Sequence, residues 1–332
     1  MCGSRNGERQ KKRHSTLKID HWTLTRDRRR PWKSCPVAGT PRTLAVTLHY
    51  PDGVPELPEV ESVRRRIARS MVRARIDAVD LRRPDLRRPF PRHFVRRLSG
   101  ETVTALDRRA KYLVATLSSG ETLLMHLGMS GSFRVIREQL PRRARREASP
   151  LDPHDHVVFH MSSGRAVVFN DPRRFGIMEL VAAGKLDRHP VLNRLGPEPL
   201  SKDFDGAALA RACHRKNTSL KAALMDQRVV AGLGNIYVSE ALHVAGLSPR
   251  RRASTIATPS GAPRDAAHRL ASAIKRVLED AIARQSRAAY GDARFLVYDR
   301  EDQRCSTPGC SGTICRRVQA GRSTFYCPVC QR

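Results

Sequence analysis

The chain has 332 residues and a formal net charge of +30 that is spread over its whole length. A domain commonly takes about 100–200 residues, so this length fits two domains and a small module, and a hydrophobic content of 40% is compatible with real cores. The charge indicates a polyanionic partner, and no run of about 18 apolar residues or amphipathic basic helix with bulky aromatics favours a membrane, so nucleic acid is the expected partner.

Residues 1–53 differ from the rest of the chain. They hold 12 Lys or Arg against 4 Asp or Glu and show almost no periodic apolar pattern. We interpret them as disordered, with a basic nucleic-acid arm and a segment absent from the native protein as alternatives. Glu8, Asp20 and Asp27 do not fit an acid-poor transit peptide, and no secretory signal is recognisable, so we expect a reducing, cytoplasmic compartment.

The stretch VPELPEVE at 54–61 predicts the start of a helix, because Pro58 suits the first turn and Glu59 suits its positive end. The pair Pro55–Glu56 comes just before this helix. If Pro55 were a chain terminus, it would be a secondary amine able to attack carbon, with a carboxyl group beside it. Inside a chain, the same nitrogen is an inert amide. Whether the protein is an enzyme depends on this difference.

After this helix, which we expect to reach about residue 70, alternating apolar patterns predict a β-rich domain over 55–183. The expected strands cover 74–81, 102–106, 112–117, 122–127, 132–136, 156–161, 166–169 and 176–181. Turn signals such as Ser-Ser-Gly at 118–120 and 162–164 separate them. The charged segment 142–146 between two strands is interpreted as a solvated loop.

A linker over 184–200 leads to a helical domain that we place at 201–290. Helices are expected from about residue 200, over 219–225, around 239–244 with an end at Gly246, and over 265–283. The order of these elements predicts an α+β fold, with a β-rich domain followed by a helical domain. Residues 295–332 remain as a third, cysteine-rich module.

The last module carries a strong metal-binding signal. Four residues separate Cys305 from Cys310, two separate Cys327 from Cys330, and sixteen lie between the pairs. Four thiolates at this spacing predict one structural zinc ion in a ribbon. We interpret the remaining four cysteines as spare thiols: Cys2, Cys35, Cys213 and Cys315. Between the two pairs, RSTFY at 322–326 predicts a hairpin tip suited to phosphate contacts.

The glycines at 231–235 (AGLGN) match neither nucleotide-binding motif. Tyr237 stands where a dinucleotide fingerprint needs a third glycine, and no Lys-Ser/Thr follows as in a phosphate-binding loop, so we expect no nucleotide cofactor. A glycine turn before a helix can also hold a DNA phosphate on its backbone N–H groups, with Asn235 assisting. A plain turn between helices is the alternative.

Seven motifs together resemble the formamidopyrimidine-DNA glycosylase family. They are VPELPEVE at 54–61, RRAKYL at 108–113, HLGMSGS at 126–132, DPRRFG at 171–176, LGPEPL at 195–200, GLGNIYVSE at 232–240 and RSTFYCPVCQ at 322–331. The resemblance implies a two-layer β-rich N-terminal domain, a helix-two-turn-helix domain and a zinc β-ribbon. It also implies damaged double-stranded DNA as partner and an enzyme that is both a glycosylase for oxidised purines and an AP lyase. The substrates implied are formamidopyrimidines, with 8-oxoguanine as a further candidate, and we expect a monomer.

By this resemblance, Pro55 is the nucleophile on the sugar, Glu56 moves protons on it and Lys111 binds a phosphate beside the scission site. Arg322 completes this catalytic set, and together with Asn235 it clamps the phosphates that flank the lesion. The nucleotide has to be rotated out of the duplex, so other side chains must fill the gap. The DNA-binding residues implied by the family are His126, Met129, Arg173, Phe175, Asn235 and Lys185, the last as a further active-site lysine.

Two departures from the family pattern leave alternatives. The first cysteine pair is spaced by four residues where many relatives have two, and only the short segment 285–294 (QSRAAYGDAR) stands where a long lesion-reading loop is common. An endonuclease VIII-like enzyme for oxidised pyrimidines is therefore one alternative. A zinc-containing DNA-binding protein without catalysis is the other, because the chemistry requires Pro55 to be a free terminus. We accordingly expect the native chain to start at Val54, translated as Met and then removed.

Overall fold

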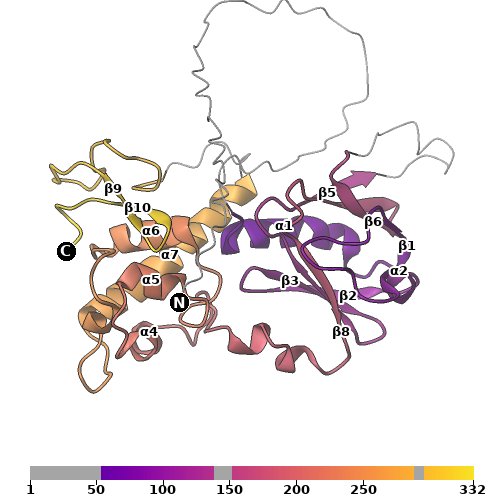
Figure 1. Ribbon diagram of the computed structural model, residues 1–332, viewed down its shortest axis with the longest axis horizontal. Coiled ribbons are helices and arrows are strands. Elements are labelled where there is room, and N and C mark those ends of the chain that lie inside the picture. Colours follow the sequence, from indigo (N-terminus) through magenta and orange to yellow (C-terminus); the bar gives the residue numbers. More distant parts are fainter. Residues whose placement is uncertain (1–53, 138–151, 288–294) are drawn as a thin grey trace, which may run out of the picture. The chain divides into compact units, whose positions relative to one another are not determined.

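The computed structural model describes residues 54–137, 152–287 and 295–332 (Figure 1). The predicted extension at 1–53, the loop at 142–146 and most of the short segment 285–294 lie outside these residues. All the described residues belong to one compact unit.

The sheet domain contains two antiparallel four-stranded sheets, with strand orders β1-β6-β7-β5 and β2-β3-β4-β8. The strands are β1 (Ile76–Leu81), β2 (Val103–Arg109), β3 (Tyr112–Leu117), β4 (Thr122–His126), β5 (Ser132–Arg137), β6 (Asp155–Met161), β7 (Arg165–Asn170) and β8 (Ile177–Val181). All eight predicted strands are confirmed, with shifts of a few residues at their ends. The short helix α2 (Phe94–Leu98), which lies beside β1 in Figure 1, was not predicted.

Helix α1 (Leu57–Met71) contributes to two hydrophobic cores. Val60, Val63 and Ile67 are buried with the inward side chains of both sheets. Leu57, one turn earlier, is buried instead among the helices of the second domain. The start of the apolar face of α1 thus packs against a different domain from the rest of that face.

Two 3-10 turns, η1 (Leu186–Arg188) and η2 (Leu192–Arg194), connect the sheet domain to the helices. Leu192 packs against Val114 and Leu124, so the connection covers the outer side of β3 and β4. Strands with apolar side chains on both faces need such a cover, because one face would otherwise expose apolar area to water.

The helical domain consists of α4 (Gly206–Cys213), α5 (Leu220–Met225), α6 (Asn235–Val244), η3 (Ala253–Ile256) and α7 (Asp265–Arg287). Asp205 caps α4 by accepting from the Ala208 N–H at 2.7 Å, which satisfies a backbone donor without a partner in the helix. Helix α7 extends four residues beyond the predicted 265–283, so Gln285 belongs to it. No helix of the described ranges is both long and apolar enough to cross a membrane.

The cysteine-rich module forms a small hairpin of β9 (Cys315–Gln319) and β10 (Arg322–Tyr326). Val297, Ile314 and Phe325 form its small buried core together with cysteines. Glu240 of α6 accepts the backbone N–H groups of residues 296–298 at 2.8–2.9 Å, which fixes the module to the helical domain. The predicted α+β fold class is thereby confirmed.

Candidate active site and DNA-binding surface

Glu56 is held at the first turn of α6. Its side chain is 3% exposed and accepts the N–H groups of Ile236 at 2.9 Å and Tyr237 at 3.3 Å. A Cβ on Gly234 would lie 2.3 Å from the Glu56 carboxyl carbon, so only glycine fits there. The sequence left open a phosphate site or a plain turn here, and a phosphate on these two backbone N–H groups is excluded because the Glu56 carboxylate accepts both.

The preceding glycine accommodates the same segment. Gly232 has a φ of +86°, and a Cβ there would lie 2.7 Å from Leu57. Its carbonyl accepts the Leu57 N–H at 3.1 Å. The glycine turn is thus shaped around 56–57, a relation between distant segments that motif matching did not suggest.

Lys111 and Arg322 complete a charged cluster around Glu56. Burial raises the pKa of Glu56, and the positive charge of Lys111 opposes that shift. Burial also lowers the pKa of Lys111, which Glu56 and Glu59 oppose and Arg322 reinforces. The structure therefore brings together Glu56, Lys111 and Arg322 from α1, the β2–β3 turn and β10. Pro55, buried and next to Glu56 in the chain, belongs to the same place.

Glu59 lies directly behind Glu56. It accepts the Glu56 N–H at 2.9 Å, the Tyr237 hydroxyl at 2.6 Å and the Gln285 amide at 2.5 Å. Burial raises the pKa of Glu59 to about 7. The sequence suggested only a helix-start role for this residue, whereas its contacts connect the Pro55–Glu56 peptide to α6 and to the end of α7.

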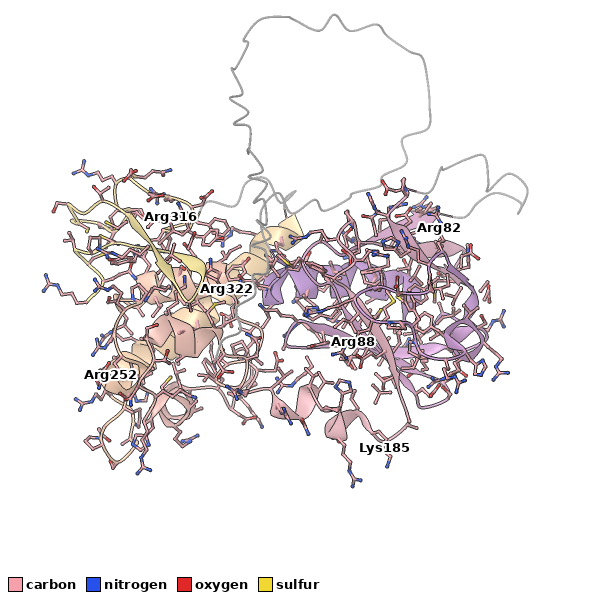
Figure 2. All side chains as sticks on the ribbon, viewed as in Figure 1. Arg82, Arg88, Lys185, Arg252, Arg316 and Arg322 are labelled. Atoms are coloured by element: carbon pink, nitrogen blue, oxygen red, sulfur yellow. The ribbon has the colours of Figure 1, made fainter. Side chains whose placement is uncertain are left out.

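The structure does not bring Lys185 to this cluster. Lys185 is exposed in the turn after β8, well away from Arg322 in Figure 2. Lys221 of α5 is there instead: it is 2% exposed, and burial lowers its pKa to about 8 against the opposing charge of Glu56. The sequence did contain a signal, because Lys221 falls on the apolar side of a helix, between Leu220 and Leu224.

Lys221 and Asn235 both contact β10. The Lys221 ammonium donates to the Ser323 carbonyl at 2.9 Å and to the Thr324 hydroxyl at 2.7 Å. The Asn235 amide donates to the same carbonyl at 3.0 Å. These bonds fix the strand that begins with Arg322, so Asn235 and Arg322, predicted as a pair, do lie close together.

Met129 and Phe175 project from two adjoining loops. Each is 38% exposed, so both side chains are available for insertion into a base stack. The Arg173 guanidinium lies 4.9 Å from the centre of the Phe175 ring. A Cβ on Gly128 would lie 2.3 Å from the Phe175 carbonyl carbon, so the two loops touch through their backbones.

Asp171 connects these two loops. Its fully buried carboxylate accepts the Ser130 hydroxyl at 2.5 Å and the Gly176 N–H at 2.7 Å. One side chain therefore fixes the loop of Met129 against the loop of Phe175. No pattern in the sequence indicated this role of Asp171.

His126 is an uncharged donor at neutral pH. Burial lowers its pKa to about 4, with the nearby Lys111 charge acting in the same direction. Its Nδ1 accepts the Gly128 N–H at 2.9 Å, so the ring proton must be on Nε2. A neutral imidazole can donate one hydrogen bond to a phosphate without adding charge.

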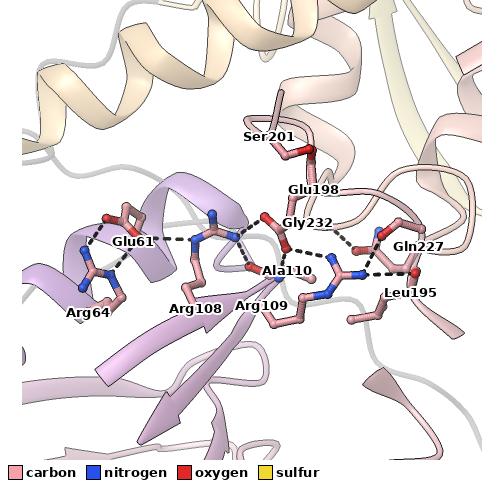
Figure 3. A network of polar contacts seen from close by, with 11 residues as sticks. Glu61, Arg64, Arg108, Arg109, Ala110, Leu195, Glu198, Ser201, Gln227 and Gly232 are labelled. Carbon is pink, nitrogen blue, oxygen red and sulfur yellow. Dashed lines mark hydrogen bonds and ion pairs between the residues drawn. The ribbon is translucent and has the colours of Figure 1, made fainter. Parts of the chain in front are cut away.

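A network of ion pairs fixes the β2–β3 turn that carries Lys111 (Figure 3). Glu198 of the connecting segment accepts from Arg108 and Arg109 at 2.9 Å each and from the Ala110 N–H at 2.5 Å. Arg108 also donates to Glu61 of α1 at 3.3 Å. Ala110 has a φ of +52°, a left-handed conformation that needs support from its surroundings in any residue other than glycine.

The four predicted metal ligands converge. Their sulfur atoms all lie within 4.8 Å of one another, with 3.8 Å between Cys305 and Cys330 and 3.6 Å between Cys310 and Cys327. A tetrahedral zinc with bonds of about 2.3 Å requires sulfur separations of roughly 3.8 Å. The cluster could therefore hold such a metal ion. Cys315 instead donates to the Thr313 carbonyl at 3.8 Å and is not in the cluster.

Exposed basic side chains occur on all three parts of the described chain. Figure 2 labels examples from the sheet domain, the connecting segment, the helical domain and the hairpin: Arg82, Arg88, Lys185, Arg252, Arg316 and Arg322. The high positive charge is thus a property of the folded surface.

Comparison with known proteins gives two family matches. The model of the formamidopyrimidine-DNA glycosylase N-terminal domain matches residues 54–178, and the model of the formamidopyrimidine-DNA glycosylase H2TH domain matches residues 195–290. Similar curated proteins include formamidopyrimidine-DNA glycosylases of Bradyrhizobium sp. strain BTAi1, 57% identical, and Rhodopseudomonas palustris strain HaA2, 56% identical. Both alignments cover 84% of this chain and 100% of the relative.

Solved structures give the same result at lower identity. The Lactococcus lactis formamidopyrimidine-DNA glycosylase bound to DNA with an abasic site is 29% identical, with a TM-score of 0.70 over 84% of this chain and 100% of that chain. The Lactococcus lactis enzyme bound to DNA containing the lesion Fapy-dG is 29% identical, with a TM-score of 0.72 over 83% of this chain and 100% of that chain.

Proposed function

The chain belongs to the formamidopyrimidine-DNA glycosylase family, and we propose that it excises oxidised purines from duplex DNA by attack of Pro55 on the sugar of the damaged nucleotide. The observation that carries this proposal is the anchoring of the Pro55–Glu56 segment on α6, with Lys111 and Arg322 beside it. The relatives solved in complex with abasic-site and Fapy-dG DNA support the substrate class.

In the first step, the free amine of Pro55 attacks C1′ of the sugar, and the bond from C1′ to the base breaks as the base leaves with a proton. Opening of the sugar ring and loss of the amine proton give an iminium ion. Removal of a proton from C2′ then expels the 3′ phosphate, and a second elimination expels the 5′ phosphate. This sequence combines glycosylase and lyase activity in one site.

Glu56 is suited to move protons on the sugar. Burial raises the pKa of its carboxyl group, so the group binds a proton more readily than an exposed carboxyl does, as a general acid must. Its two bonds to α6 fix its position. Lys111, held close to it, would supply positive charge for a phosphate at the scission site, and its own lowered pKa favours proton exchange.

We propose that DNA is held by phosphate contacts from Arg322, Asn235 and His126. Lys221 takes the position of the further active-site lysine, because it is buried next to Glu56 and Arg322, whereas Lys185 would contact only the outer part of the surface. When the lesion is rotated out, Met129 and Phe175 would fill the gap and Arg173 would pair with the orphan base.

We further propose that the catalytic form begins at Pro55. The N-terminal family model starts at residue 54, and the whole length of the curated relatives aligns with 84% of this chain. An internal proline nitrogen is a tertiary amide whose lone pair is delocalised and which has no proton to lose, so it cannot form an iminium. Residues 1–53 would therefore be absent from the active protein.

In the domain assignment that we propose, residues 55–183 are catalytic, 184–200 connect, 201–290 bind DNA and 295–332 form a zinc ribbon. Cys305, Cys310, Cys327 and Cys330 would hold one structural zinc ion, since four thiolates favour zinc and the small core of the module needs a further source of stability. We place the protein in the cytoplasm with the chromosomal DNA.

The proposal is tested by borohydride trapping, which reduces the iminium to a stable amine. The full chain is compared with a chain that starts at Met in place of Val54, on duplexes with a formamidopyrimidine, 8-oxoguanine, an oxidised pyrimidine or no lesion. We expect an adduct only from the short chain, on Pro55 by mass spectrometry, and most readily with the purine lesions. An equal adduct from an unprocessed full chain would exclude Pro55 as the nucleophile. Preference for the pyrimidine lesion would favour the endonuclease VIII-like alternative, and binding without any adduct would favour the non-catalytic one.

A further inference from the structure

An apolar hollow lies beside α2. It is separate from the catalytic cluster and from Met129 and Phe175. Its volume is about 450 Å³, within the ~300–1,000 Å³ of ordinary ligand pockets. Eight residues line it: Leu81, Pro84, Phe90, Pro91, His93, Phe94, Val95 and Arg96. None of them belongs to the site described above.

The wall of this hollow is aromatic and partly open to solvent. The rings of Phe90 and Phe94 lie 5.0 Å apart at 43°. Phe90 is half-buried, and Val95, on the outer side of α2, is 37% exposed. An apolar side chain of a ligand that entered the hollow would contact these rings and Val95.

The hollow is bordered by positive charge that the chain leaves uncompensated. Residues 81–98 contain seven arginines and one aspartate. Arg97 pairs with Glu121, and that one aspartate, Asp85, pairs with Arg174. Arg92 and Arg96 are exposed and form no ion pair with any described residue. Two free guanidinium groups therefore lie next to an apolar cavity.

Two other arginines of residues 81–98, Arg87 and Arg88, make contacts near the Phe175 loop. The backbone N–H of Arg87 donates to the Gly176 carbonyl at 3.2 Å, and its charge helps to lower the pKa of His126. Arg88 pairs with Glu179 at 2.9 Å. Arg87 and Arg88 are thus engaged with the Phe175 loop and β8, whereas Arg92 and Arg96 have no ion-pair partner among the described residues.

We propose that this hollow docks an acidic peptide segment of a partner protein. An apolar or aromatic side chain of the peptide enters between Phe90, Phe94 and Val95, and carboxylates beside it pair with Arg92 and Arg96. Arginine forms bidentate hydrogen bonds with carboxylates, so such a contact has a defined geometry as well as charge complementarity.

A nucleic acid fits the hollow less well. Phosphates would satisfy the arginines, but an inserted base would bury polar edge atoms against a lining that offers few polar partners. Leaving such groups without hydrogen bonds is costly. A peptide can supply both the negative charge for the arginines and the apolar group for the hollow, because its carboxylates stay at the rim while its apolar side chain is buried.

The test measures fluorescence anisotropy of a labelled peptide, Asp-Asp-Asp-Asp-Gly-Phe, with the full chain at low salt. Val95→Glu and the pair Arg92→Glu with Arg96→Glu should each weaken binding by about tenfold or more, as for anchor residues of an interface. Val191→Glu is the control for Val95→Glu and Arg194→Glu is the control for the arginine pair. Val191 is 38% exposed, Arg194 is also exposed, and both lie in the connecting segment, outside the hollow. These controls should bind the peptide as the unmodified chain does.

Two further ligands make the outcome decisive. A peptide with Ala in place of Phe should bind about tenfold more weakly, and a single-stranded oligothymidylate should not depend on Val95. Equal binding of the Phe and Ala peptides, or no loss with Val95→Glu, would overturn the proposal. So would an oligothymidylate that binds more tightly than the peptide and is lost with Val95→Glu, because the hollow would then be a nucleic-acid site. Unchanged thermal unfolding of the variants shows that they fold.

Discussion

Replacing Glu198 with Gln should slow strand cleavage through Lys111, although Glu198 itself lies in the connecting segment. Gln keeps one acceptor for the Ala110 N–H but removes the charge that pairs with Arg108 and Arg109. The β2–β3 turn then loses its main support next to Lys111. A displacement of about 1 Å at a reacting centre can cost roughly 100-fold in rate, so we expect a loss of about 10- to 100-fold.

The exposures of the three side chains set the expected loss of stability. Arg108 is 11% exposed, Glu198 22% and Arg109 31%, so the network lies between a surface pair and a buried one. Surface pairs contribute about 0–1 kcal/mol, and breaking a buried pair costs about 3–5 kcal/mol. Arg108 keeps Glu61, and Arg109 keeps two backbone carbonyls. We therefore expect Glu198→Gln to lower the free energy of unfolding by roughly 2 kcal/mol.

The assay is single-turnover cleavage of a lesion duplex by the short chain, with urea unfolding measured in parallel. Glu121→Gln is a matched control, because Glu121 is also 22% exposed and pairs with an arginine, Arg97, that is 32% exposed. It should lose some stability but keep its cleavage rate. A double mutant with Lys111→Ala separates the explanations, since a residue that acts through Lys111 gives non-additive losses. Additive losses in rate would refute the reasoning.

Four other predictions follow from single residues. Arg322→Ala should weaken binding of damaged and undamaged duplex alike and reduce the salt slope by about one unit; loss of lesion preference at an unchanged slope would indicate base contacts instead. Cys327→Ser should release metal, measured by elemental analysis, and weaken DNA binding; active protein without stoichiometric metal would contradict the ribbon assignment. Asp171→Asn should loosen the loops of Met129 and Phe175 and reduce flipping of the lesion, which the fluorescence of a base analogue opposite the lesion measures. Unchanged flipping would mean that the two loops keep their positions without the Asp171 carboxylate. Glu59 has a pKa raised to about 7 in the folded chain, so stability should fall by roughly 3 kcal/mol as pH rises from about 4.5 to 7. Urea midpoints at pH 5 and pH 8 should show this fall, and Glu59→Gln should remove it.

Stability falls with rising pH at Glu59 because the folded state retains the carboxyl proton to a higher pH than the unfolded state does. Below the unfolded pKa the carboxyl group is protonated in both states and burial costs little. Between the unfolded and the folded pKa, only the folded state retains the proton, so folding becomes less favourable as pH rises. Above the folded pKa, the buried group is ionised in both states and the loss is complete.

The strands were predictable from short runs of β-branched and apolar residues bounded by turn residues, and not from a strict alternation of buried and exposed positions. In Tyr112–Leu117, for example, four of the six residues are buried. Helix α2 is only five residues long, and within a segment rich in arginine and proline it leaves no periodic signal. Short elements of this kind are held by packing against neighbours, which the local sequence does not contain.

The sequence indicated several of the residues that the structure brings together, such as Glu56, Lys111 and Arg322, but not their contacts. Glu56 and Ile236 are 180 positions apart, and nothing at either position indicates that one caps the other. A glycine turn before a helix can bind a phosphate, so the sequence left that role open for Gly232 and Gly234 beside a plain turn. Only the close approach of Leu57 and Glu56 shows why these two positions need glycine here.

The same contacts show how this fold would hold a terminal amine at Pro55 in a fixed position. A chain terminus is usually mobile, yet catalysis requires the amine within roughly 3–3.5 Å of the sugar carbon. Leu57 is buried among the helices, whereas Val60 and Val63 are buried among the strands. Glu56 is bonded to α6 through its side chain and to Glu59 through its backbone. Pro55 is therefore one residue away from the Glu56 anchor on α6 and five residues away from Val60, the first of these residues buried among the strands, so the helical domain fixes its position more directly.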